Sequence, residues 1–321
     1  MEQLDYNIRE YRDSDLIGVL ALWEHHSGWG RPETKEYRKW IETPCGKYIV
    51  LVAEGEKEQI VGQLILTPTE LFIYGKKQKG LKMSAPIIHS DFRSSNVMNT
   101  ESLMIQISLK AYQIAQKKNY EWFYNFPAAG WSKIMRLAYR FGFSPWKINF
   151  YECYEILDSN IIISDFNLQI LDKFPDEIKI IWERFKERNN DKSFVTRDLK
   201  WLNYKWGDDF KVGIYNSKGK LDGYAVIKKQ SGLILDFVVL DYNQIPGVLI
   251  KLKQLFDNHA TTNDNSNSGL KFMMTPFFAE KIPGDFLKPV NYEFVFGLCP
   301  LNDFVSVEKL SLEDWYVFPN D

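Results

Sequence analysis

Hydrophobic positions along the chain follow two periods, and the order in which these periods occur predicts the fold. In the first half, β-type alternation or short apolar runs mark residues 6–10, 48–53, 60–67, 70–74, 81–88, 120–125 and 145–157. Spacing of three and four residues, which is typical of helices, marks 15–25, 33–42, 99–119 and 132–141. In the first of these helices, Ile17, Leu20 and Ala21 share one face. We therefore expect a mixed, mostly antiparallel sheet flanked by helices.

The second half repeats a similar order of elements. The pattern predicts helices over 175–188 and 245–259, and strands over 210–215, 223–229, 233–240, 270–274 and 290–298. We expect the last two strands to complete a second sheet. Residues 158–172 have no regular period and no run of Gly, Ser or Pro, so we interpret them as a passage between two packed halves. The predicted fold class is α+β, with domains at 1–160 and 161–321.

Composition narrows the class of protein. The 321 residues are 45% hydrophobic, which is enough for two cores, and 40 Lys and Arg balance 42 Asp and Glu. This balance argues against a nucleic-acid partner. The chain begins without the apolar stretch of a signal peptide, and no apolar run reaches the ~20 residues of a membrane span, so we expect a cytoplasmic protein. The widely spaced Cys45, Cys153 and Cys299 predict neither a disulfide framework nor a metal site. A homo-oligomer remains open.

The most informative stretch joins the strand 81–88 to the helix 99–119. Ile87 and Ile88 end the strand, and the loop then reads His89, Ser90, Asp91, Phe92, Arg93, Ser94, Ser95, Asn96, Val97, Met98. Backbone N–H groups converge in such a loop, and the dipole of the following helix favours an anion such as a pyrophosphate. Arg93 adds a fork of charged donors. The alternative is an ordinary strand–loop–helix junction without a ligand.

The segment 89–93, followed by a polar loop and a long helix, resembles the acetyl-CoA signature of the GNAT N-acetyltransferases. In that family an Arg/Gln-x-x-Gly-x-Gly/Ala loop wraps the CoA pyrophosphate. Asn96 and Met98 stand at the two glycine positions, and of the two only Asn readily adopts a positive φ. Residues 136–143, Arg-Leu-x-x-Arg-Phe-Gly-Phe, are similar to the second family motif, where a helix ends in Leu-Gly-Phe. The resemblance implies acetyl-CoA or another acyl-CoA as co-substrate.

The second half resembles a degenerate copy of the same fold. Residues 197–204, Arg-Asp-x-x-Trp-Leu-Asn-Tyr, are similar to a segment of two-domain GNAT-like proteins linked to surface polysaccharide or lipid modification. At the place of a pyrophosphate loop, residues 241–247 lack the Arg-x-x-Gly-x-Gly pattern and contain Pro246. The resemblance thus implies tandem GNAT-like domains, of which the second does not bind CoA.

The resemblance also assigns roles to particular residues. It implies acyl-CoA binding by Ile87, Ile88, Arg93, Ser94, Ser95, Asn96, Val97, Met98 and Asn125. In the family a Tyr acts as the general acid for the departing thiolate, and Ala138 stands at its position here. The neighbouring Tyr139 is the candidate catalytic acid in its place, provided that the helix is rotated, because it points about 100° away from position 138. Because the strand 81–88 holds no Asp or Glu, the candidate bases are His89 and Glu24, with His25 and His26 as further candidates. The candidate acceptor-binding residues are His25, His26 and Trp29.

Each of these assignments has a simpler alternative. The imidazole of His89 can cap the loop, His25 and His26 can be solvated surface residues, and Asn125 can be a polar residue of a β-bulge. For the whole chain, the resemblance implies acyl transfer from acyl-CoA to a small-molecule amine, such as an amino sugar, by direct attack. A GNAT-like binding protein without catalysis stays open. So does a Fem-type aminoacyl transferase, although the helical coiled arm of that type is missing.

Overall fold

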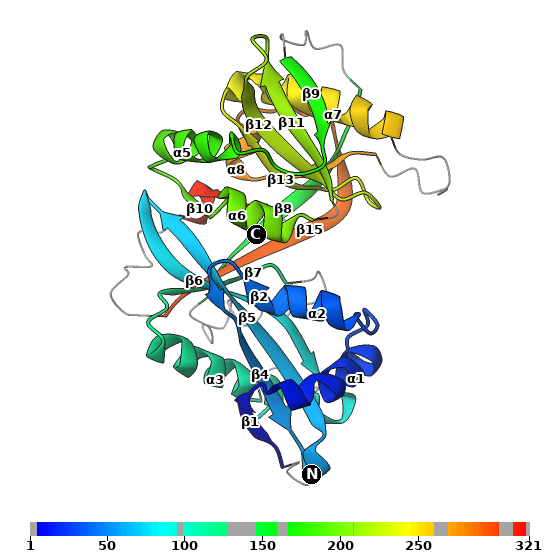
Figure 1. The fold of residues 1–321 in the computed structure, drawn as a ribbon, viewed down its shortest axis with the longest axis vertical. Helices are drawn as coiled ribbons and strands as arrows, with labels where there is room; N and C mark the ends of the chain where they lie inside the picture. The colour runs from blue at the N-terminus through cyan, green and yellow to red at the C-terminus, as the bar shows by residue number, and fades with distance from the viewer. Residues whose placement is uncertain are drawn as a thin grey trace.

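The computed structural model of the chain describes residues 5–94, 99–127, 146–158, 166–207, 209–259, 269–301 and 311–318. These residues form an α+β structure with a sheet of ten strands, a sheet of four strands and a small hairpin. Figure 1 shows the four-stranded sheet with α5 and α7 at the top and β4, β5 and β6 at the bottom, with β8 and β15 running between them. The α+β prediction is confirmed.

The elements have the following bounds. The strands are β1 (Asn7–Glu10), β2 (Glu42–Thr43), β3 (Gly46–Lys47), β4 (Ile49–Glu54), β5 (Ile60–Ile73), β6 (Lys76–Ile88), β7 (Trp122–Asn125), β8 (Lys147–Ile156), β9 (Phe166–Leu171), β10 (Ser193–Val195), β11 (Phe210–Asn216), β12 (Leu221–Ile227), β13 (Ile234–Val239), β14 (Lys271–Met273), β15 (Leu287–Pro300) and β16 (Trp315–Tyr316). The helices are α1 (Leu16–His26), α2 (Thr34–Ile41), α3 (Leu103–Lys117), α5 (Ile178–Arg188), α6 (Leu199–Lys205), α7 (Ile245–His259) and α8 (Pro276–Ala279). Two 3₁₀ turns used below are η3 (Ser90–Phe92) and η7 (Leu312–Asp314).

The ten-stranded sheet combines strands from both halves of the chain. Its main order is β1-β4-β5-β6-β7-β15-β8-β14, with β10 and β16 beside the end of β5. Gly297 of β15 pairs with Asn125 of β7 on one side and with Ile148 of β8 on the other. The expectation that 270–274 and 290–298 complete a second sheet was therefore wrong. By lying between β7 and β8, β15 satisfies the backbone groups of two edges at once.

The four-stranded sheet has the order β13-β12-β11-β9, with antiparallel neighbours throughout. Its strand β9 lies inside the segment 158–172 that we interpreted as a passage, so that interpretation was wrong for residues 166–171. β9 is an edge strand in which Phe166 alone is fully buried, while Ile170 is 45% exposed. Its alternation is weak because an edge strand of this kind contributes little to the core.

A long hairpin, β5 and β6, forms the centre of the first half. The segments 60–67 and 70–74, predicted as separate strands, are one strand that continues through Pro68, opposite Leu81. β6 carries a bulge where Ser84 and Ile87 pair with Ile65 and Gln63. Ala85 in this bulge has a φ of 47°, a left-handed value that bulges often require. The bulge therefore bends β6 locally, while Ile87 and Ile88 stay paired with β5.

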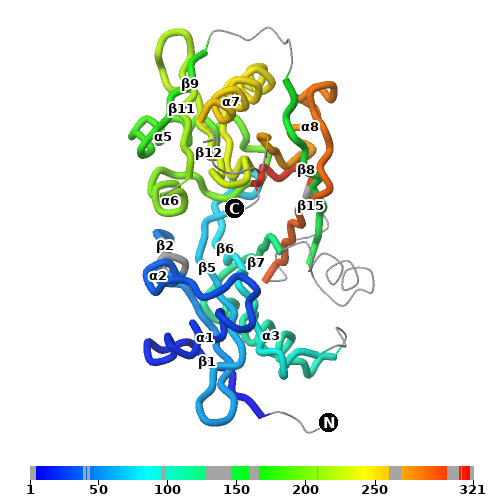
Figure 2. The backbone as a smooth tube through the Cα atoms, turned by 90° about the vertical axis from the view of Figure 1, so that its right-hand side faces the viewer, coloured from blue at the N-terminus to red at the C-terminus, as the bar shows by residue number. Residues whose placement is uncertain are grey.

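Helices cover both faces of this hairpin (Figure 2). The buried stripe of α3, including Ile107 and Ala111, packs with Leu81 and Phe123 on one face. On the other face α1 buries Val19, Leu20, Leu22 and Trp23. The predicted face of α1 was partly wrong, because Ile17 is 77% exposed.

The core of the second half contains a buried ion pair. Arg197 Nε donates to Asp236 Oδ1 at 2.9 Å, and the Tyr224 hydroxyl donates to Asp236 Oδ2 at 3.2 Å. Both charged side chains are almost fully buried. The next residue, Asp198, caps α6 by accepting from Trp201 N at 2.8 Å. The Arg-Asp segment singled out in the sequence thus has a structural role in this half.

Candidate functional site

The parallel strands β6 and β7 separate soon after they meet. They pair at Gly80 with Trp122, Leu81 with Phe123 and Lys82 with Tyr124, and β6 then continues to Ile88 without β7 as a partner. The other edge of β6 stays paired with β5 up to Ile88. A strand edge without a neighbouring strand offers backbone N–H and C=O groups to an extended ligand. We call this opening, bordered by residues 83–88 of β6 and by Asn125, the first splay.

Arg93 ties together the two elements at the tip of the first splay. Its Nε donates to the carbonyl of Ile88, the last residue of β6, at 2.8 Å. Its Nη2 donates to the carbonyl of His26, the last residue of α1, at 2.6 Å. Ser90 N donates to His26 Nδ1 at 3.3 Å. The loop and the end of α1 are thus held as one unit, and the cation also partly neutralises the carbonyl end of the helix.

Two predicted residues from separate segments, His26 and His89, are in contact at this unit, with their ring planes tilted by 43°. Their ring centroids are 4.0 Å apart. His89 Nδ1 accepts from Asp91 N at 3.3 Å and caps η3, as the simpler alternative proposed. Since each Nδ1 accepts a backbone N–H, the neutral rings carry their proton on Nε2. Burial lowers the pKa of His26, and the neighbouring His89 and Arg93 lower it further.

The other candidates on the acceptor side are more exposed to solvent than His26 and His89. Glu24 forms an exposed ion pair with Arg31 at 3.2 Å, and Trp29 is 63% exposed with its ring 5.6 Å from that of Trp23. His25 is exposed, with its ring centroid 6.3 Å from that of His26. Outside the described residues lie Ser95, Asn96, Val97, Met98, Ala138, Tyr139 and the predicted helix 132–141.

Asn125 lies at the end of β7, on the opposite side of the first splay from β6. Its Oδ1 is buried and accepts no hydrogen bond from any residue in the described part of the chain. Buried acceptors in native proteins nearly always have a partner. An amide N–H of a bound ligand can supply the missing donor, and pantetheine contains two such groups. The role of Asn125 in binding acyl-CoA stays a prediction.

Sequence reasoning missed Gln63, a fully buried polar residue on β5. Its Oε1 accepts from Trp23 Nε1 and from the Tyr37 hydroxyl, both at 3.2 Å, while its Nε2 donates to no described residue. Gln63 pairs in the sheet with Ile87 at the end of β6. The signal was present in the sequence, because a single Gln interrupts the apolar run 60–66.

Comparison with known structures identifies the fold that contains this geometry. No family model matches the chain, and no curated protein matches it in sequence. A GCN5-related N-acetyltransferase from Anabaena variabilis is similar in structure, with a TM-score of 0.64 and 14% identity over 93% of this chain and 73% of that one. The chain has the GNAT fold. This confirms the resemblance that was based on residues 89–93.

Two further structures with the GNAT fold align over most of the chain. A tandem GNAT protein of the clavulanic acid pathway gives a TM-score of 0.55 at 12% identity, over 94% of this chain and 100% of that one. Saccharomyces cerevisiae N-myristoyltransferase with bound myristoyl-CoA gives 0.58 at 11%, over 93% and 79%. At these identities the likeness concerns the fold alone.

Two other features were sought among the described residues, a metal-binding cluster and a membrane-spanning helix. Within the described ranges, no group of three or more His, Cys, Asp or Glu residues is placed to hold a metal ion. None of the helices in those ranges has both the length and the apolar character needed to cross a membrane.

Proposed function

We propose that the chain is an N-acyltransferase that moves an acetyl or other acyl group from acyl-CoA to a small-molecule amine. The observation that carries the proposal is the first splay, where β6 leaves β7 beside the buried Oδ1 of Asn125, which has no partner among the described residues. An acyl-CoA arm can lie in this opening like an added strand, with its amides bonded to β6 and to Asn125. The pyrophosphate then lies at the loop 93–98, before α3.

In this proposal the described residues mainly bind and orient the acyl-CoA and the amine. Arg93 fixes the end of β6 against α1, and the Nε2–H groups of His26 and His89 are donors beside the first splay. The amine nitrogen attacks the thioester carbonyl carbon, a C–N bond forms, and the C–S bond breaks with its electron pair on sulfur. One proton leaves the nitrogen and one reaches the thiolate. The lowered pKa of His26 keeps its ring neutral. Its Nδ1 can accept the proton that leaves the amine nitrogen, once the hydrogen bond from Ser90 N–H is broken.

A covalent cysteine intermediate is not part of the proposal. Burial raises the pKa of Cys45 and of Cys153 to about 11, and that of Cys299 to about 12. A thiol with such a pKa is almost entirely protonated at neutral pH, and the thiolate is the reactive form. Direct attack by the amine needs no such nucleophile.

Calorimetry with acetyl-CoA tests the binding part of the proposal. Arg93→Ala removes the positive charge beside the loop and the hydrogen bonds that hold the end of β6 against α1, so it should lower the affinity roughly ten- to a hundredfold. Asn125→Ala removes a neutral hydrogen bond and should lower it about two- to tenfold. Asn203→Ala, at an exposed position of α6, is the matched control. No heat at millimolar acetyl-CoA, or equal affinity in all three variants, contradicts the proposal.

A thiol-release assay with a panel of amines, amino sugars included, tests the transfer. One observation favours the alternative of a binding protein without catalysis. Both imidazoles at the first splay already accept a backbone N–H at Nδ1, so neither has a free lone pair for a proton. Acetyl-CoA binding without thiol release from any amine would select that alternative.

A further inference from the structure

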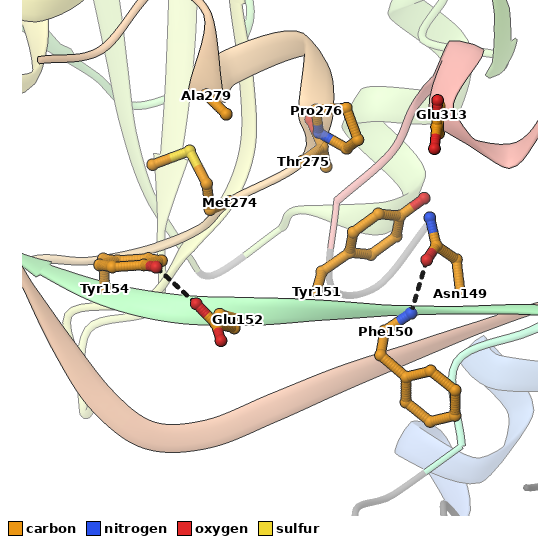
Figure 3. Close-up of a pocket in the computed structure, with 10 residues that line it drawn as sticks. All are labelled: Asn149, Phe150, Tyr151, Glu152, Tyr154, Met274, Thr275, Pro276, Ala279 and Glu313. Carbon is orange, nitrogen blue, oxygen red and sulfur yellow. Dashed lines mark hydrogen bonds between the residues drawn. The ribbon is translucent and has the colours of Figure 1, made fainter. Parts of the chain in front are cut away.

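A second cavity lies away from the first splay, against β8. It has a volume of about 380 Å³ and opens between β8, the junction of β14 with α8, and η7 (Figure 3). Its polar lining includes Asn149, Tyr151, Glu152, Tyr154, Thr275 and Glu313. Met274, Pro276 and Ala279 supply an apolar wall. Three segments that are far apart in the sequence therefore build one pocket.

The pocket is lined by negative charge without a matching cation. Two carboxylates, Glu152 and Glu313, line it, and none of its lining residues is Lys, Arg or His. Neither carboxylate forms an ion pair within the described part of the chain, although the adjacent Asp314 pairs with Lys192 at 3.1 Å. Glu152 accepts a hydrogen bond from the Tyr154 hydroxyl. The field in this pocket thus favours a positively charged ligand.

Thr275 gives an independent indication of a ligand. It is fully buried in the pocket wall, and its hydroxyl forms no hydrogen bond with any described residue. Although Thr275 precedes α8, its side chain does not cap that helix. A buried hydroxyl without a partner is unfavourable, and a ligand N–H can supply one. Figure 3 shows Thr275 above β8, on the side of the pocket opposite Glu152.

We propose that this pocket binds the protonated amino group of a small organic cation. The ammonium group donates to Thr275 Oγ1 and lies between the carboxylates of Glu152 and Glu313, since an ammonium group carries three donors and a full charge. The carbon chain of the cation packs against Met274 and Pro276, and the ring of Tyr154 adds a cation–π surface. The volume is within the range of small-molecule sites.

This site is separate from the one proposed for acyl-CoA. Asn125 and Ile148 pair with opposite sides of Gly297, so β7 and β8 are two strand spacings apart, about 10 Å. Asn149, which lines the pocket, follows Ile148. Binding at the pocket therefore needs neither acyl-CoA nor acyl transfer, and it can be measured without them.

The test is titration of the full chain with 1,5-diaminopentane at low salt, followed by calorimetry or NMR, without CoA. The neutral 1,5-pentanediol has the same chain length and should bind at least about tenfold more weakly. Glu152→Gln and Glu313→Gln should each weaken diamine binding about two- to fivefold, as expected for partly exposed charges. Glu155→Gln, on β8 but outside the pocket, is the matched control and should leave binding unchanged.

Thr275→Val separates a ligand-binding role from a structural one. Because the hydroxyl has no partner among the residues that the structure describes, its removal should leave the Tm unchanged or raise it by about 1–3 °C, while diamine binding weakens several-fold. Thr275→Ser should keep binding. Equal binding of diamine and diol, or equal loss in Glu155→Gln and Glu313→Gln, overturns the proposal. So does a Thr275→Val variant that is destabilised but binds the diamine normally.

Discussion

The two halves of the chain each contain a place where parallel strands separate, and the two places differ in what fills them. In the first splay, β6 and β7 part after Lys82 and Tyr124, and the buried Oδ1 of Asn125 has no partner in the described ranges. In the second half, β13 and β14 approach one another at the single bridge between Leu233 and Lys271. We call the region beyond this bridge the second splay.

Aromatic side chains fill the second splay. The Tyr316 hydroxyl donates to the carbonyl of Phe237 on β13, an edge strand of the four-stranded sheet. The ring of Phe318 packs 6.0 Å from Phe272 and 5.6 Å from Phe278. The chain thus uses its own residues 316–318 where the first splay leaves room for a ligand. One strand arrangement can therefore serve as a binding site or as a packed core, depending on which side chains reach it.

The largest effect is expected at β13, where the second splay depends on the buried ion pair. Asp236→Ala removes the carboxylate that pairs with the buried Arg197, and breaking such a pair costs about 3–5 kcal/mol of unfolding free energy. Urea unfolding measures the loss. Asp176→Ala breaks the exposed pair with Lys179 and should change stability by less than about 0.5 kcal/mol. Equal losses in the two variants would show that the second splay does not depend on its buried charges.

A smaller effect is expected for the hydrogen bond across the second splay. Tyr316→Phe leaves the Phe237 carbonyl without this donor and should cost about 1–3 kcal/mol of unfolding free energy. Tyr292→Phe, at a half-exposed ring, is the matched control. The stoichiometry of acetyl-CoA binding should stay unchanged in Tyr316→Phe, because Phe272, Phe278 and Phe318 still fill the space. A second bound acetyl-CoA would mean that one hydroxyl alone keeps the two splays different.

The smallest effect concerns pH and belongs to the first splay. The pKa of His26 in the folded chain is lowered from 6.5, so the unfolded chain binds more protons below that pH. The stability that neutral His26 contributes is present above pH 6.5 and is lost as the pH falls from 6.5 through the lower folded pKa. His26→Gln should flatten the dependence of Tm on pH between 7.5 and 5.5, whereas Asn203→Ala, at an exposed position of α6, should not. Identical pH profiles for the two variants would contradict this account of the first splay.

Local pattern predicted most elements, and the exceptions have a common cause. The predicted helix 245–259 agrees with α7, and the apolar face of α5, with Ile178 and Trp182, is buried. Partners of strands were not predicted, because periodicity reports which face of a strand is buried and not which strand lies beside it. That is why β15 was expected in the second sheet. β9 was missed since its side chains are mostly exposed.

The sequence predicted individual residues of the candidate site, but not the contacts between them. Arg93 was assigned to the cofactor and His26 to the acceptor, yet they share a hydrogen bond across 67 positions of sequence. Local sequence pattern does not predict a contact between residues so far apart in the chain. The division at residue 160 stays a prediction, as do the roles of residues 95–98 and Tyr139.

The position of β15 has a consequence for how the chain is made. β7 and β8 leave the ribosome long before their shared neighbour, since about 130 residues separate the end of β8 from the start of β15. At typical rates of synthesis of ~5–20 residues per second, this interval is on the order of 10 s. Throughout it, the edges of β7 and β8 that β15 will join lack this partner, and the other edge of β8 waits for β14 during most of the same interval. A nascent chain of this kind depends on being kept apart from its neighbours until its last strands arrive.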